Sequence, residues 1–199
     1  VVAESGTPAD AGKASANIGQ TVELNGMGLS ILSGVIFETI NDGGVRGQVV
    51  VNPWFANATG TQIKVTVPPN ATTGVLRLVG DQTATAVPLQ IVPTLRASDV
   101  EYLASNNTLA HVTLSGSGLV EGNNAEYHFG KVTVFDGSAS TGPNVYGGAA
   151  PDYLVNGRVT LDVPISDDMQ GGITVTTDGG TSAALTFGLT AVTGVAMSG

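Results

Sequence analysis

The chain contains no cysteine, so it has no disulfide bond, no thiolate nucleophile and no cysteine-ligated metal site. Charged residues make up only 12%, and the seven Lys and Arg residues are scattered along the sequence. Because phosphate groups are bound by clustered Lys and Arg, we expect no nucleic-acid partner and no anionic membrane surface. No apolar run approaches the roughly 20 residues that cross a bilayer as a helix, so we expect no membrane insertion.

What the chain does contain is typical of β-rich proteins outside the cell. Its 199 residues are 42% hydrophobic, which is enough to bury a core, and the formal net charge is −9. Glycine, threonine, serine, asparagine and valine are abundant. We therefore expect an extracellular or cell-surface location. Because domains commonly contain about 100–150 residues, the length suits one large domain or two small ones.

Alternation with a period of two predicts β-strands along most of the sequence. In the segment TQIKVTVP (Thr61–Pro68), apolar and polar side chains alternate, and the same holds for GRVTLDVP (Gly157–Pro164). This period is typical of a half-buried strand. Both segments end at a proline, which lacks the backbone N–H needed to continue the ladder. No stretch has a convincing amphipathic helical pattern.

The same order of segments occurs twice. TVELNGMGLS begins at Thr21 and HVTLSGSGLV begins at His111. A short apolar run follows in each copy (VIF in the first, VTVF in the second), then a strand ending in Val-Pro, a polar turn, a glycine and a final apolar strand. We therefore predict an all-β protein of two tandem immunoglobulin-like β-sandwich domains, residues 1–94 and 95–199. The second copy would begin with the strand DVEYLA from Asp99, and it carries a loop insertion near 137–152.

The Gly-x-Gly-Leu element ends the strand that opens each copy. Its glycines permit a sharp turn or a bulge, and we expect Leu29 and Leu119 to fold back over the end of each core. A nucleotide-binding glycine loop would need a third glycine and a helix that begins on it. Neither copy has these features.

Several of these segments are similar to a known family. In the first copy they are GQTVELNGMGL, VIFE, TQIKVTVPPNATTGVLRLV and PLQIV; in the second they are AHVTLSGSGL, VTVFDG, GRVTLDVP, GGITVTTDGG and LTFGL. The pattern resembles the IPT/TIG domain, the immunoglobulin-like, early-set β-sandwich found in many bacterial surface proteins. The resemblance covers nearly the whole chain and is looser in the second copy, which departs from it by the insertion at 137–152. It implies a module without a catalytic signature.

Sugar binding is the main alternative among binding functions. A β-sandwich can present an aromatic side chain to a pyranose ring, and the candidates are Trp54, Tyr146 and Tyr153. Tyr146 lies within the long Gly-, Pro- and Ser-rich insertion at 137–152 and Tyr153 directly follows it; loops of that length are often functional. Packing of Trp54 against its own neighbours is the alternative interpretation.

The sequence contains few candidate catalytic or metal-binding residues. Asp167 and Asp168 lie on one turn and are candidate Ca²⁺ ligands, although no calcium-loop motif is present and acidic turns are also ordinary. Of the two histidines, we expect His111 to be satisfied at a strand end, and His128 to form a surface pair with Glu126. No Gly-x-Ser-x-Gly element occurs. We therefore predict no enzyme, no catalytic residue and no cofactor, with Ca²⁺ left open.

These observations predict a non-catalytic structural module, a segment or subunit of a cell-surface stalk, surface layer or filament. Its partners would be other copies or neighbouring domains of a longer chain. The alternative is an adhesin module that binds a carbohydrate or receptor through Trp54 or the 137–152 loop. The C-terminal LTAVTGVAMSG repeats the pattern of an apolar end strand followed by a new valine-led start. That repetition fits either a segment of a longer tandem array or a ragged end.

Overall fold

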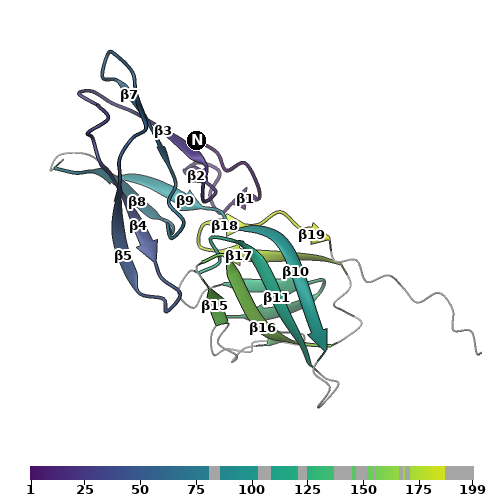
Figure 1. The fold of residues 1–199 in the computed structure, drawn as a ribbon. Coiled ribbons are helices and arrows are strands. Elements are labelled where there is room, and N and C mark those ends of the chain that lie inside the picture. The colour runs from purple at the N-terminus through teal and green to yellow at the C-terminus, as the bar shows by residue number, and fades with distance from the viewer. Residues whose placement is uncertain are drawn as a thin grey trace, which may run out of the picture.

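A computed structural model describes residues 1–80, 86–102, 109–120, 125–136, 145–146, 152–154, 156–165, 168 and 171–186. These residues form an all-β fold, as the sequence predicts, and no α-helix occurs among them (Figure 1). No helix in the described part of the chain is long and apolar enough to span a bilayer.

The first group of strands forms two sheets, with orders β2-β9-β8-β4-β5 and β3-β7-β6. The strands are β2 (Ala14–Ala16), β3 (Thr21–Asn25), β4 (Val35–Ile40), β5 (Arg46–Val51), β6 (Phe55–Ala56), β7 (Gln62–Thr66), β8 (Gly74–Leu78) and β9 (Val87–Ile91).

The second group also forms two sheets. One has the order β10-β11-β16-β15, and the other has the order β1-β18-β17-β12-β13-β14, with β19 also paired to β17. The strands are β1 (Thr7–Pro8), β10 (Thr94–Tyr102), β11 (Leu109–Ser117), β12 (Glu126–Phe129), β13 (Val132–Phe135), β14 (Val145–Tyr146), β15 (Asp152–Leu154), β16 (Arg158–Pro164), β17 (Gly172–Thr177), β18 (Gly180–Thr181) and β19 (Leu185–Thr186).

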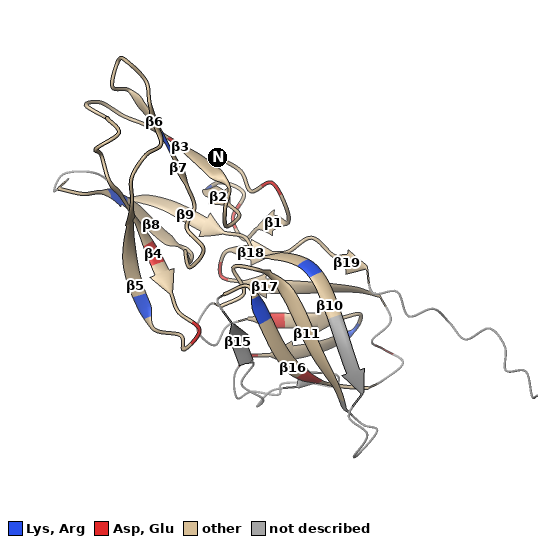
Figure 2. Ribbon diagram, in the orientation of Figure 1, with Lys and Arg blue, Asp and Glu red and all other residues tan. Residues whose placement is uncertain are grey.

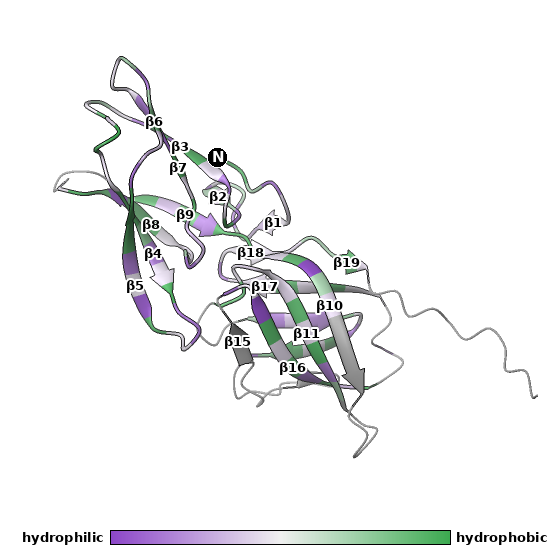
Figure 3. Cartoon of the chain, viewed as in Figure 1, coloured by the Kyte–Doolittle hydropathy of each residue, from purple (hydrophilic) through white to green (hydrophobic). Residues whose placement is uncertain are grey.

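The predicted alternation is confirmed in both Val-Pro strands. Along β7 and just past it, the side chains of Ile63, Val65 and Val67 are buried while their neighbours are more exposed. The strand β16 repeats this pattern with Val159, Leu161 and Val163, and its hydrophobic and hydrophilic segments alternate in Figure 3. Burying one face of each strand supplies the main favourable free energy of folding.

Buried apolar side chains form two clusters, one in each group of strands. The first includes Phe37 and Ile63, and the second includes Tyr127 and Leu114. Leu29 is 7% exposed and Leu119 is fully buried, so both leucines of the Gly-x-Gly-Leu elements close their clusters as predicted. Each cluster draws on both sheets of its group, which is the packing of a β-sandwich.

Strand pairing in the second group follows the ABED and CFG orders of immunoglobulin-like sandwiches. There β10-β11-β16-β15 corresponds to A-B-E-D, and β12-β17-β19 corresponds to C-F-G. In the first group, β3-β7-β6 corresponds to B-E-D and β4-β8-β9 to C-F-G. No described strand takes position A beside β3, because β2 pairs in parallel with β9 instead.

Two local predictions were wrong. The run VTVF does not correspond to VIF: β12, not β13, pairs with β17 as β4 pairs with β8. Periodicity hid this because β12 and β13 both alternate buried and exposed residues. The second copy also begins its first strand at Thr94 rather than Asp99. The strand extends further back because Gly116 allows Thr94 to approach β11 closely.

The two groups meet at a junction built around the turn Asp178–Gly180. The strand β1 pairs with β18, so an N-terminal segment joins the sheet of the second group (Figure 1). A Cβ atom on Gly179 would overlap the backbone of Ile91. Only glycine permits so close an approach of two backbones.

A pair of buried amides ties the N-terminal segment to the first group. The Gln90 side chain, 5% exposed, exchanges hydrogen bonds of 2.7 and 2.8 Å with the backbone of Asp10. The Asn17 amide donates to the carbonyl oxygens of Ser5 and Val92. The backbone N–H of Gly12, and then the Lys13 side chain, lower the pKa of the exposed Asp10 carboxyl below its usual value.

Asn156 connects the groups from the other side of the junction. It is 3% exposed, and its φ of 47° lies in the left-handed region, which asparagine tolerates better than most residues. Its Oδ1 accepts a 2.8 Å hydrogen bond from the N–H of Val120, and its own N–H donates to Asp42 Oδ1 at 2.8 Å. Its Nδ2 donates to the carbonyl oxygen of Pro69 at 3.4 Å.

We expect Asn156→Ala to lower the free energy of unfolding by about 1–3 kcal/mol, because it leaves the buried N–H of Val120 without its acceptor. Chemical denaturation measures this change. The control Asp42→Ala removes the acceptor of the Asn156 N–H and leaves the hydrogen bond of Val120 in place, so it should destabilise the protein less. Equal effects of the two substitutions would contradict this role for Asn156.

Candidate functional site

The free edge of β3 is the most unusual feature of the described fold. The N–H of Gly26 donates to the carbonyl oxygen of Thr61, and the N–H of Val67 donates to that of Gln20. The backbone N–H and C=O groups of the even-numbered residues of β3 therefore point toward β7. Because hydrogen-bonding directions alternate along a strand, the backbone groups of Thr21, Glu23 and Asn25 face the opposite side, where no described strand pairs with them.

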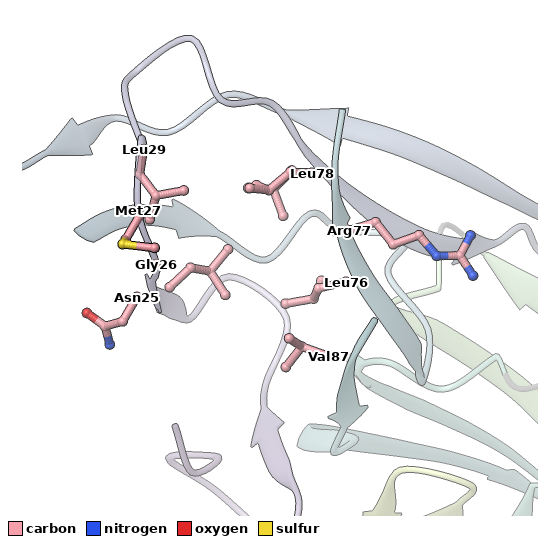
Figure 4. A pocket seen from close by; sticks show the side chains of 10 residues that line it. Asn25, Gly26, Met27, Leu29, Leu76, Arg77, Leu78 and Val87 are labelled. Carbon is pink, nitrogen blue, oxygen red and sulfur yellow. The ribbon is translucent and has the colours of Figure 1, made fainter. Parts of the chain in front are cut away.

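An apolar groove lies beside this edge, between β3 and the strands β8 and β9 (Figure 4). The short strand β2 pairs only with Leu89–Ile91, so it leaves Val87 47% exposed. Met27, 92% exposed, lines the groove as well, whereas the Arg77 guanidinium points away from it. The apolar side chains of the groove are those of Leu24, Leu29, Val35, Leu76, Leu78 and Val87.

The corresponding edge of the second group is occupied. There β10 pairs with β11, from Thr94 opposite Ser117 to Tyr102 opposite Ala110. Leu95 of β10 packs against the second apolar cluster. The two edges carry the same sequence element, but in the first group no described strand covers the edge that β10 covers in the second.

The glycines of the repeated element show this difference directly. A Cβ atom on Gly116 would overlap the carbonyl oxygen of Thr94, because β10 lies against it. At Gly118, such an atom would lie 3.4 Å from Ile91 Cγ2 and 3.5 Å from Pro93 Cα. At Gly26 it would meet only the side chain of Leu29, at 3.4 Å or more, and at Gly28 nothing within 4 Å. Among the described residues, nothing in the first group occupies the space that a strand fills in the second.

The residues predicted to bind a sugar do not converge. Trp54 is 60% exposed, and its ring centroid lies 6.2 Å from that of Phe55, tilted by 56°. The Nζ of Lys64 lies 5.5 Å from the Phe55 centroid. Tyr146 lies on β14, which pairs with β13, and Tyr153 lies on β15, which pairs with β16. These two strands belong to different sheets, and most of the 137–152 insertion lies outside the described residues.

The predicted metal ligands are not brought together with other acids. Asp167 lies outside the described residues. The carbonyl oxygen of Asp168 accepts a 2.8 Å hydrogen bond from the N–H of Lys131, and its Oδ1 lies 3.3 Å from Lys131 Nζ. Across the described ranges, no three His, Asp or Glu side chains form a group that could hold a metal ion.

The two histidines lie on different sheets. His111 Nδ1 is 2.8 Å from Asp162 Oδ1, directly across the β11–β16 pair. His128 Nε2 is 3.4 Å from Glu126 Oε2, and its Nδ1 is 3.1 Å from Thr133 Oγ1. Both imidazoles therefore have partners on their own sheets, and each pair is partly exposed.

Compared with protein-family models and with curated proteins, the chain matches none. The free edge and its groove therefore stand on geometry. Sequence reasoning allowed for uncapped strand edges through which one chain lends a strand to the next, but it did not place such an edge at β3, although a signal was available. HVTLSGSGL follows closely on the segment that begins at Asp99, whereas the matching TVELNGMGL follows the glycine- and alanine-containing GKASANIGQ.

The two matched glycines give a direct comparison of a covered and an open edge. We expect Gly116→Val to lower the free energy of unfolding by about 1–3 kcal/mol or more, since β10 must move away. Gly26→Val should change it by less than about 1 kcal/mol, because valine suits a strand and has room there. Thermal or denaturant unfolding of both variants measures this. Equal destabilisation would show that Gly26 is also covered.

Proposed function

We propose that this chain is a non-catalytic structural module of the cell surface, a segment or subunit of a stalk, layer or filament. In this proposal, residues 1–94 and 95–199 are two immunoglobulin-like sandwiches in tandem, similar to IPT/TIG domains. Two separate apolar clusters support that division, although β1 crosses it by pairing with β18. A junction held by backbone pairing, close glycines and Asn156 is suited to a fixed connection between the two.

The observation that carries the proposal is the free β3 edge above an apolar groove. Unpaired strand edges readily accept another strand. Two of the side chains that line the groove, Met27 and Val87, are 92% and 47% exposed. Exposed apolar surface gathered at one place is typical of an interaction site. The chain therefore offers an attachment point for a further protein segment.

Charge bears on how copies would associate. The formal net charge is −9, and the blue segments that mark Lys and Arg lie apart from one another along the ribbon in Figure 2. Two copies therefore repel each other at long range, and salt screens that repulsion. The absence of a basic cluster also supports a partner other than nucleic acid.

We expect the purified chain to self-associate, and to do so more strongly as salt rises. Raising the salt from 0.01 to 0.1 M shortens the screening length from about 30 to about 10 Å, so like-charged copies approach more easily. Sedimentation velocity over a range of protein concentrations measures the association, and electron micrographs distinguish chains or sheets from single particles. A monomer at every salt and protein concentration would contradict the proposal.

Carbohydrate binding is the second candidate, because Trp54 is exposed rather than packed into a core. An accessible indole ring can stack on a sugar, and its exposed area is available for that contact. In this case Trp54→Ala should weaken glycan binding by about tenfold or more, equivalent to about 1.4 kcal/mol. A glycan array followed by titration of the bound sugars measures it. The control Val50→Ala removes an exposed aliphatic side chain and should leave sugar binding intact.

A further inference from the structure

We propose that the β3 edge and its groove accept residues 187–199 of a second copy of this chain. That segment would add as a strand antiparallel to β3, with its apolar side chains in the groove. The inference rests on the proposed function, since it names the strand through which the subunits join.

The second group supplies the template for this contact. There the edge strand β10 follows directly on β9, so the end of one sandwich provides the first strand of the next. Among the described residues, the first group has no strand in the same place. The segment that follows the second group is the counterpart of β10 in chain order. In this proposal a second copy donates that segment.

The acceptor has both features that strand addition requires. The outward backbone groups of Thr21, Glu23 and Asn25 supply hydrogen bonds, and the groove supplies pockets for alternate side chains. The nearest carboxylate is already engaged, because Glu23 lies 3.6 Å from Lys64 Nζ and accepts a 2.8 Å hydrogen bond from Gln62. Gly26 and Gly28 leave space for a backbone to approach, as their counterparts do for β10 and the segment before it.

The proposed donor has the sequence FGLTAVTGVAMSG and follows β19, as β10 follows β9. Four of the five larger apolar residues, Phe187, Leu189, Val195 and Met197, have odd numbers and so fall on one face of a strand; the fifth, Val192, falls on the other face with Gly188 and Gly194. This alternation is typical of a strand with one buried face. The segment contains no Asp, Glu, Lys or Arg, so burying it against the groove desolvates no charged side chain.

A synthetic peptide of residues 187–199 tests the contact without requiring the protein to assemble. Fluorescence anisotropy with dilute full-length chain should show saturable binding. Gly26→Val should weaken it by about tenfold or more (about 1.4 kcal/mol), because the valine side chain occupies the path of the docked strand. The matched control Trp54→Ala should bind the peptide normally. Absent binding, or equal binding to wild type and Gly26→Val, would overturn the inference.

Cross-linking identifies which copy donates the strand. Because the chain has no cysteine, Asn25→Cys and Gly194→Cys variants can be mixed and treated with a short bismaleimide. A covalent heterodimer is expected, and it should disappear when Gly26→Val is added to the Asn25→Cys chain. A double variant that cross-links only within itself at all concentrations would overturn donation by a second copy.

The two proposals can fail separately. If the Gly26→Val variant still self-associates and the peptide does not bind, the structural module is supported and the proposed donor segment is wrong. If the peptide binds to wild type but not to Gly26→Val, and the chain is monomeric at all salt concentrations, the groove is supported as a binding site and the self-assembling module is wrong.

Discussion

The backbone N–H and C=O groups at the edges of the sheets require hydrogen-bonding partners, and this requirement explains much of the arrangement of the strands. Each strand edge exposes N–H and C=O groups that must meet another strand, a side chain or water. In the second group β10 meets this need along β11, and at the junction β1 meets it along β18. At β3 the need is left to solvent among the described residues. An apolar groove lies beside that edge. A strand that paired with β3 would also remove leucine and valine surface from water, which water molecules at the same edge cannot do.

Comparison of the two similar sequence elements reveals the free edge. Both elements have the same alternation and the same pair of glycines, but a strand lies against only the second among the described residues. At Gly116 the absence of a side chain is required by the backbone of Thr94, while at Gly26 nothing in the described structure requires it. The first copy therefore has the same edge geometry as the second without a described strand against it, and the proposed function rests on this difference between the copies.

Much of the fold follows from the sequence because strands with one buried face alternate visibly. The strands around Ile63 and Val159, and the closing leucines Leu29 and Leu119, were predicted in this way and confirmed. Strand assignments failed where two neighbouring runs alternate equally well, as in β12 and β13. The junction could not be predicted, because the Asp178–Gly180 turn is an ordinary hairpin sequence whose partner is Ile91, far away in the chain. The free edge was not located because pairing between distant strands leaves no pattern within one segment; its signal becomes visible only when the segments that precede the two repeated elements are compared.

The β1–β18 pair also determines how the molecule responds to pulling. It joins residues 7–8 to residues 180–181, so it closes a loop that contains nearly all of both apolar clusters. Tension applied to the chain before β1 and after β18 therefore loads this short pair, together with the hydrogen bonds of Ser5 with Asn17 and the pairing of β19 with β17. The two-residue pair acts as a clamp that limits how far the two sandwiches can be drawn apart.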